Sequence, residues 1–519
     1  MSTQQLQPRA TNYGIANPWW RKYVNLWVLA FVLLGFVFCA LLVSVLAYSA
    51  HWGAVIAVVL VLVAPIMLFW GATSFGESIQ KWSLLKPKLR WWHALWFLLY
   101  LSTLVWRVRD QGAIQQNPLD AYAFFRIVPE TIVFGWLMVR FSRRENVYAW
   151  LSSLFGGVPR WLTFFALACL ASTLWSVFPA WTLFKSLEYM LDLWVLAAVL
   201  SNVVSLEDFR SLFRWTWAIL AAELAWVWIQ IPLWPANSFE DGRLKGFFPS
   251  TAYNYVGQSG AIFAILAFCR LLPARDTKRE NVPFATIVFV GGVATLLACQ
   301  TRNTIAAFGF AVLVVLVLTK RKWMIVTGAI AGVAAFFLTP LGQVAMTYLQ
   351  RDQSRQAMEE MTGRAELWSY AWQQFLAHPF TGMGAYAAGR FFIMTKIGKD
   401  TASLHSDWVE LLVGVGLMGL IPFVMALFGT WWYLVKSVSD KTLTPEHRQM
   451  VLEAVGVLAV ITIHSIFNDE LTWHAPLLFM SVLGCAELLR RRKKGIIKIR
   501  SPLSVVAAKP FGSRAYTTR

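Results

Sequence analysis

The sequence predicts an all-α protein, a polytopic bundle of transmembrane helices. Hydrophobic residues make up 58% of its 519 positions and charged residues 14%, against about 45 to 50% and about 25% in soluble proteins. Apolar runs of about 16 to 25 residues recur along the chain, and a helix of about 20 apolar residues crosses a bilayer core about 30 Å thick. One long polar interval, residues 340–406, interrupts this pattern.

Fourteen apolar runs are long enough to be considered as spans, which predicts about 12 to 14 crossings. The third run is short and the fourth contains Arg126 and Glu130, so each is also a candidate for a tilted or interfacial helix. The runs cover residues 24–48, 53–72, 92–106, 123–140, 161–178, 183–203, 211–231, 254–272, 283–299, 304–319, 322–339, 407–435, 450–467 and 473–489.

Lysine and arginine gather in alternate short loops and in the tail from Arg490 to Lys494. Because cytoplasmic loops contain an excess of these residues, both termini are predicted to be cytoplasmic. The opposite loops, among them 232–253, 300–303 and 340–406, are then predicted to face outward. The net charge of +19 is therefore explained by membrane orientation, and nucleic acid is not an expected partner.

The predicted organisation follows the apolar runs. Within the outer loop, apolar residues recur at helical spacing from Arg364 to Ala377, which predicts a surface helix packed on the bundle or in the headgroup layer. The five cysteines lie singly in apolar runs and predict neither a disulfide framework nor a metal site. The predicted parts are N-terminal spans (1–160), central spans (161–339), the outer loop (340–406), C-terminal spans (407–489) and a basic cytoplasmic tail (490–519).

Basic residues suited to phosphate binding occur in two of the predicted outer loops. Arg243 and Lys245 lie in the loop 232–253, and Arg302 lies in a short turn between two apolar runs. A guanidinium presents a planar fork of donors that fits phosphate oxygens. The alternative for Arg302 is a snorkelling side chain at a helix end.

A histidine, His405, ends the outer loop at the mouth of the next span. Histidine accepts a proton near neutral pH, and the neighbouring Asp407 or Glu410 is placed to orient it. The alternative is a helix-start histidine that bonds to a neighbour. No outer carboxylate cluster has metal-ligand spacing, so no metal is expected, although Asp469, Glu470 and His474 leave such a site open.

Three segments, Gly363–Trp368, His378–Gly384 and His405–Gly416, resemble the signature of the O-antigen ligase and O-antigen polymerase superfamily of bacterial membrane proteins. Leu174–Pro179, with Lys185 after it, resembles the middle spans of that group. The resemblance covers about residues 165 to 485. The chain departs from the family pattern at Ser406, where Asn is usual, and after Gly246.

The resemblance implies a membrane-glycosyltransferase-like fold with a large periplasmic loop, and an enzyme of the bacterial inner membrane whose site faces the periplasm. Such an enzyme takes a glycan from undecaprenyl diphosphate and needs no metal or cofactor. By the resemblance, Arg243 and Arg302, with Lys245, would hold the diphosphate and His405 would act at the acceptor hydroxyl. The expected supporting residues are Arg364, Asp407 and Glu410.

The favoured hypothesis is a polymerase that joins lipid-linked repeat units into an exopolysaccharide, capsule or O antigen. One alternative is a ligase that transfers the glycan to lipid A core, as in lipopolysaccharide, or to protein. Another is a lipid-linked oligosaccharide flippase, but the polar candidates lie at the outer boundary, whereas a carrier places them at mid-membrane in repeated helices. Expected partners are the lipid-linked glycan, a glycan or lipid A core acceptor, a chain-length regulator and a flippase.

Overall fold

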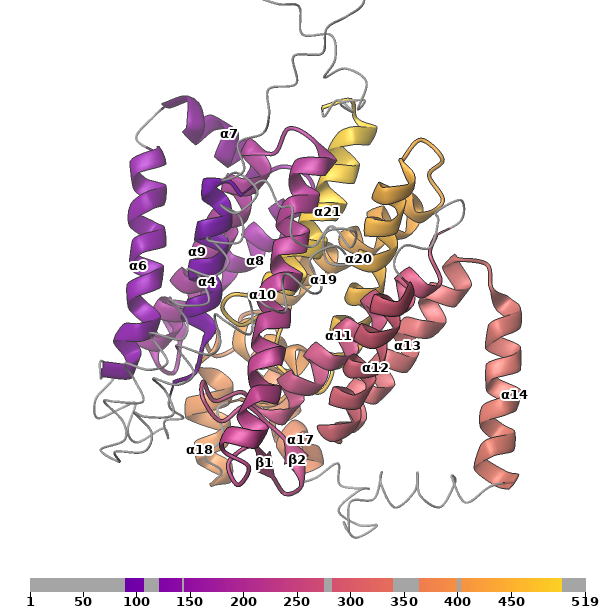
Figure 1. The fold of residues 1–519 in the computed structure, drawn as a ribbon. Helices are drawn as coiled ribbons and strands as arrows, with labels where there is room; N and C mark the ends of the chain where they lie inside the picture. Colours follow the sequence, from indigo (N-terminus) through magenta and orange to yellow (C-terminus); the bar gives the residue numbers. More distant parts are fainter. Residues whose placement is uncertain are drawn as a thin grey trace, which may run out of the picture. The chain divides into compact units, whose positions relative to one another are not determined.

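The computed structural model describes residues 89–106, 121–141, 144–274, 282–338, 364–398 and 403–496, all of them in the unit 87–519. This part of the chain is mostly helical and contains one two-stranded hairpin, which confirms the predicted helical class (Figure 1). The first two predicted spans, residues 340–363 of the long loop and the tail beyond 496 lie outside the described residues.

Each of the other twelve predicted runs forms a helix. Before the long loop these helices are α4 (Trp91–Thr103), α6 (Ala121–Phe141), α8 (Pro159–Ala171), α9 (Pro179–Asn202), α10 (Leu206–Leu233), α11 (Tyr253–Leu271), α12 (Val282–Ala298), α13 (Arg302–Leu318) and α14 (Lys322–Leu338). After it they are α19 (Asp407–Val438), α20 (Pro445–His464) and α21 (Leu477–Lys493).

Several smaller elements were not predicted from the apolar pattern. They are α7 (Arg144–Leu154), a 3-10 turn (Ser172–Trp175), the strands β1 (Phe239–Glu240) and β2 (Arg243–Leu244), a π-helical segment (Ala388–Ile393) and α18 (Met394–Ile397). The predicted loop helix forms as α17 (Arg364–Ala377).

Among the described helices, α10 and α19 are long and apolar enough to cross a membrane, judged by length and composition. A third candidate is the helix pair Val147–Leu154 and Pro159–Trp175, whose two parts are bent by 88°. Together they are apolar and long enough to form one broken span. α12, α13 and residues 322–334 of α14 are shorter apolar helices. The count of 12 to 14 spans and the topology therefore stay predictions.

Helix α19 is broken within its first third, because Gly416 has non-helical dihedral angles (φ 58°, ψ −156°). The segment 379–384 of the preceding loop packs against the break. The amides of Met383 and Gly384 donate to the carbonyls of Val413 and Gly414, at 2.8 and 2.9 Å. Beyond the break, two amides of α19 donate back to the carbonyls of residues 379 and 380, at 2.9 and 3.0 Å. The loop thus replaces the helical bonds that the break removes.

Glycines make this close approach feasible. A Cβ on Gly382 would lie 2.5 Å from the Gly414 carbonyl group, and one on Gly416 would lie 2.6 Å from the backbone of Phe380. Both glycines also have positive φ, which most side chains disfavour. The glycine-rich motifs 378–384 and 405–416 therefore meet each other in space, although they are distant in sequence.

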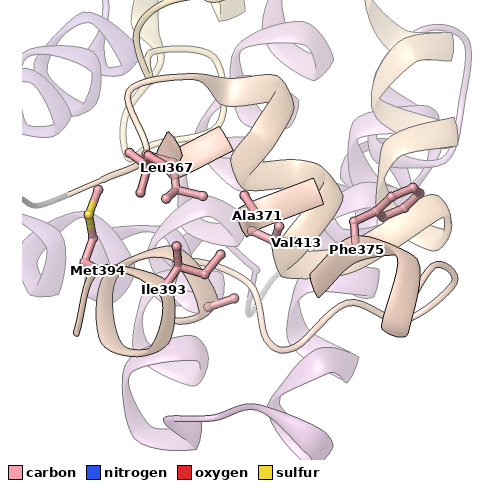
Figure 2. Packing of buried hydrophobic residues seen from close by; sticks show 8 residues of the cluster. Leu367, Ala371, Phe375, Ile393, Met394 and Val413 are labelled. Carbon is pink, nitrogen blue, oxygen red and sulfur yellow. The ribbon is translucent and has the colours of Figure 1, made fainter. Parts of the chain in front are cut away.

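Helix α17 packs by one apolar stripe onto the segment after this turn. Leu367, Ala371 and Phe375 recur at intervals of four residues and are buried. They form one cluster with Ile393, Met394 and Val413, the last from the start of α19 (Figure 2). The predicted packing of this helix on the bundle is observed, and it places the start of the helix near the loop end that contains His405.

Candidate active site

His405 occupies a backbone conformation that few residues adopt. Its φ is +55°, in the left-handed region. This conformation costs a non-glycine residue free energy and persists only where the surrounding contacts impose it. Its amide donates to Ser403 Oγ at 3.3 Å, and that hydroxyl donates to Asp469 Oδ1 at 2.9 Å. On the other side, the Leu404 amide donates to Glu410 Oε1 at 2.7 Å. The histidine is therefore fixed through its neighbours.

Asp407, predicted to orient His405, lies in a fully buried position. Its carboxylate accepts the amides of Glu470 and Leu471, both at 2.9 Å. It also accepts the amide and the hydroxyl of Thr472, at 3.2 and 2.6 Å. Four donors from one loop thus converge on one carboxylate, which attaches the loop 465–476 to the start of α19. The bonds of the Asp407 carboxylate therefore go to this loop, and within the described residues none goes to the ring of His405.

Ser406, where the family pattern usually has Asn, caps α19. Its hydroxyl accepts the amide of Val409 at 3.4 Å, as serine commonly does at this position. Because Asn is an equally good N-cap, the departure from the family pattern preserves this local role.

The electrostatic neighbours of His405 are Asp469 and Arg364. Burial lowers the pKa of His405, an effect that Asp469 opposes and Arg364 reinforces. Burial also raises the pKa of Asp469, against the influence of His405 and a hydrogen bond from Ser403. A lowered pKa favours the neutral imidazole, the form that accepts a proton. Asp469 was not predicted as a member of this group, since it lies more than 60 residues away in sequence.

Arg243 is linked to this group through an aromatic ring. Its guanidinium carbon lies 3.8 Å from the centroid of Tyr253, and Nη2 pairs with Asp241 at 3.0 Å. Tyr253 in turn interacts electrostatically with Arg364, as Asp469 does. Burial is the main cause of the lowered pKa of Arg364. The predicted residues Arg243, Arg364 and His405 therefore belong to one connected group.

The hairpin β1–β2 places Arg243 and Lys245. Asp241 and Gly242 form its two-residue turn, with φ of 48° and 72°, as expected for the primed turns that Asp-Gly favours. Lys245 pairs with Glu240 at 3.1 Å, and both side chains are partly exposed. The Asp-Gly pair is a sequence signal from which this hairpin was predictable.

The turn before Arg302 contacts the same hairpin. Gln300, with φ of +49°, donates from Nε2 to the Gly242 carbonyl at 3.4 Å. Arg302 is half-buried and begins α13 two residues later. The structure therefore places the turn of Arg302 beside the loop of Arg243, as predicted from their shared side.

A second group of ionisable residues joins α6, α9 and the loop 465–476. Arg126 lies 3.4 Å from Glu188, which also pairs with Lys185. Glu130 lies 3.3 Å from His474 Nε2, and Asp192 lies 3.0 Å from His474 Nδ1. The possible ligand atoms of Glu130, Glu188 and His474 lie within 4.8 Å of one another, close enough to hold a metal ion. Glu188 already pairs with two cations, Arg126 and Lys185, which compete with a metal ion for its carboxylate.

The arrangement is that of a helical protein with apolar helices, in which basic side chains and a histidine of lowered pKa gather at the same ends of several helices. Comparison with known families indicates the class of protein. Residues 287–424 match the family model described as O-antigen ligase, a family of membrane-integral, glycan-processing enzymes. The match confirms the resemblance to the O-antigen ligase and polymerase superfamily. It includes Arg302, Arg364 and His405, but neither Arg243 nor Lys245. No curated protein matches the chain.

Proposed function

We propose that the protein is an inner-membrane glycosyltransferase that polymerises polyprenyl-diphosphate-linked repeat units into a surface polysaccharide at the periplasmic face. The observation that supports this most strongly is the environment of His405. A histidine with a lowered pKa lies in an imposed left-handed conformation, beside Arg364 and inside the segment that matches the family.

The proposed step is direct displacement at the anomeric carbon of the donor. The acceptor hydroxyl oxygen forms a bond to that carbon, while the bond to the diphosphate oxygen breaks. A ring nitrogen of His405 takes the hydroxyl proton, and polyprenyl diphosphate leaves with the bonding electrons. Arg302 and Arg243, with Lys245 at the edge, would offset the negative charge that grows on the leaving group. Glu410 would hold the backbone beside His405 in place during this step, and Asp407 would hold the loop that contains Asp469.

Ligation is the second candidate, and the description of the matched family favours it. A ligase would use the same residues and the same donor but would pass the glycan to lipid A core or to protein. A carrier is less well supported, because the family match is to glycan-processing enzymes.

The decisive experiment is deletion of the gene in its host, followed by gel analysis of surface polysaccharide, secreted polysaccharide and lipopolysaccharide. Loss of long polymer, with single repeat units on lipid A or on the lipid carrier, supports the polymerase. Full-length polymer left on the carrier, with bare lipid A core, supports the ligase and contradicts polymerisation. An unchanged glycan profile contradicts both.

Complementation links this result to the site. The wild-type gene should restore the polymer and His405→Ala should not. A matched control is His447→Ala, which removes a histidine at the start of α20, far along that helix from the loop 465–476. Restoration by His405→Ala would contradict the proposed base.

A further inference from the structure

A cavity lies at the end of the bundle opposite to His405. Its volume is about 380 Å³, and it is lined by the turn before α8, the first residues of α8, the second half of α19 and the end of α21. Helix α19 starts beside His405, and Phe428 in the lining lies about 18 Å beyond the break at Gly416, along the second part of the helix. The cavity is therefore separate from the candidate active site.

Basic residues surround this cavity. Arg160, Arg490 and Lys494 line it, and no aspartate or glutamate does so within the described part of the chain. Aromatic side chains, among them Trp161 and Trp432, complete the lining. Arg160 also lies over the ring of Trp161, with 4.7 Å between the guanidinium carbon and the ring centroid. Such a combination of cations and aromatic rings suits a phosphate group at a membrane interface.

Arg490 is held in a fixed orientation. Its Nε and Nη2 donate to the two oxygens of Glu487 at 2.8 and 2.7 Å. The Val158 amide donates to the same carboxylate at 3.1 Å. Gly157, with φ of +62°, makes room for this pair, because a Cβ there would lie 2.4 Å from Arg490 Nε. A guanidinium has five N–H donors, so Arg490 keeps others for a phosphate oxygen.

An apolar surface leads to the cavity. Exposed residues follow one face of α19 at alternating intervals of three and four positions, and this face ends among residues that line the cavity. Because α19 is apolar and long enough to cross a membrane, such a face is suited to contact lipid chains. The exposed residues are Met418, Ile421, Met425, Phe428, Trp432 and Val435.

We propose that this cavity binds the phosphate headgroup of an anionic phospholipid, with the acyl chains along the exposed face of α19. The basic lining matches the negative headgroup, and the continuous apolar face distinguishes a lipid from a free anion. The proposal does not depend on the reaction catalysed at the other end.

Native mass spectrometry of the full-length protein in detergent tests this. Dioleoyl-phosphatidylglycerol, dioleoyl-phosphatidylcholine and inorganic phosphate are titrated separately. Arg160→Gln with Lys494→Gln should weaken phosphatidylglycerol binding about 20- to 30-fold, the effect of removing two charges near a lipid surface. The control pair Lys322→Gln with Lys441→Gln removes two exposed cations outside the lining and should change binding by no more than about threefold.

Equal binding of the two lipids, or unchanged binding by the Arg160 and Lys494 variant, would overturn the proposal. Competition by phosphate alone at similar concentrations would also overturn it, since the site would then bind a free anion. If the double variant does not fold, a photoreactive phosphatidylglycerol is used with the wild-type protein. Adducts in residues 157–161 and 425–433 are expected, and their absence there would contradict the proposed site.

Discussion

His474 lies in the loop 465–476, and His405 interacts with Asp469 of the same loop, but the two rings have different surroundings. The side chain of His474 is fully buried. Its Nδ1 faces Asp192 at 3.0 Å, and its Nε2 lies 2.6 Å from Ser102 Oγ and 3.3 Å from Glu130. The imidazole of His405 is half-buried, and among the described residues it makes no hydrogen bond.

The difference in hydrogen bonding indicates a structural role for the ring of His474 and leaves the ring of His405 able to react. Both nitrogens of His474 already have partners, so its ring connects α4, α6 and α9 to the loop 465–476. His405 is positioned through its backbone by Ser403 and Glu410 instead, which leaves the ring for a substrate. The comparison predicts that one histidine determines rate and the other determines stability.

The largest effect is expected for His405→Ala. Removal of a general base costs about 10² to 10⁴ in rate, so transfer from a lipid-linked donor by the purified protein should fall by that factor. The melting temperature in detergent should stay within about 3 °C of the wild type, because the ring makes no described hydrogen bond. Retention of more than a tenth of the activity would contradict the assignment of His405 as the base.

His474→Ala should act in the opposite way. It leaves the buried Asp192 without its hydrogen-bond partner and leaves Glu130 only Arg126, 3.9 Å away. Breaking a buried pair costs about 3 to 5 kcal/mol. Thermal unfolding in detergent should report this loss. In the fraction that stays folded, kcat should lie within about threefold of the wild type. A thousandfold loss of kcat with normal unfolding would reverse the assignment of the two histidines.

Asp407→Asn should weaken the attachment of the loop 465–476. An amide has one acceptor oxygen, so its NH2 group would face backbone donors that now bind the carboxylate. We expect a stability loss of about 1 to 3 kcal/mol and faster hydrogen exchange at residues 470–472. Glu366→Gln, on the exposed face of α17, is the control and should leave both quantities unchanged.

The pH dependence sharpens the role assigned to His405. Because the base is active when neutral, activity should rise with pH through its pKa and then level off. Burial lowers that pKa, so the rise should lie below pH 6.5. Asp469 raises the pKa, so Asp469→Asn should move the rise to lower pH. A pH–rate profile for each protein measures this, and a shift to higher pH would contradict the assignment.

The smallest effect is expected for Lys245→Gln. Lys245 pairs with an exposed glutamate, Glu240, and such pairs contribute little. Its removal should change KM for the lipid-linked donor by less than about threefold.

Arg302→Lys should have a larger effect on the same KM than Lys245→Gln, because lysine keeps the charge but loses the planar fork. Equal effects of the two substitutions would contradict the larger role proposed for Arg302 than for Lys245 in binding the diphosphate.

Local patterns in the sequence were sufficient to predict much of this structure. Apolar runs gave the main helices, and the spacing of apolar residues predicted α17 from Arg364 to Ala377. The family motifs predicted the region of His405. Each of these signals lies within a short stretch of chain, where helical periodicity determines which residues share a face.

The remaining features depend on contacts between distant residues. Nothing near Asp407 indicates that its partners are three backbone amides and a hydroxyl in residues 470–472. Likewise, Arg126 and Glu130 were noted as unusual in an apolar run, but their partners on α9 follow only from packing. The left-handed conformation of His405 has no sequence signal either, since most such positions contain glycine or asparagine.

The break at Gly416 has a consequence for how the protein is made. Residues 379–384 leave the ribosome before α19 does, and they supply the partners for four backbone groups of that helix. Without them, those groups would face hydrocarbon at a cost of several kcal/mol each. Because α19 is long and apolar enough to cross a membrane, we expect the upstream turn to be in place before this helix inserts. A defect in residues 379–384 would thus show itself as failed insertion of a helix that begins more than 20 residues later.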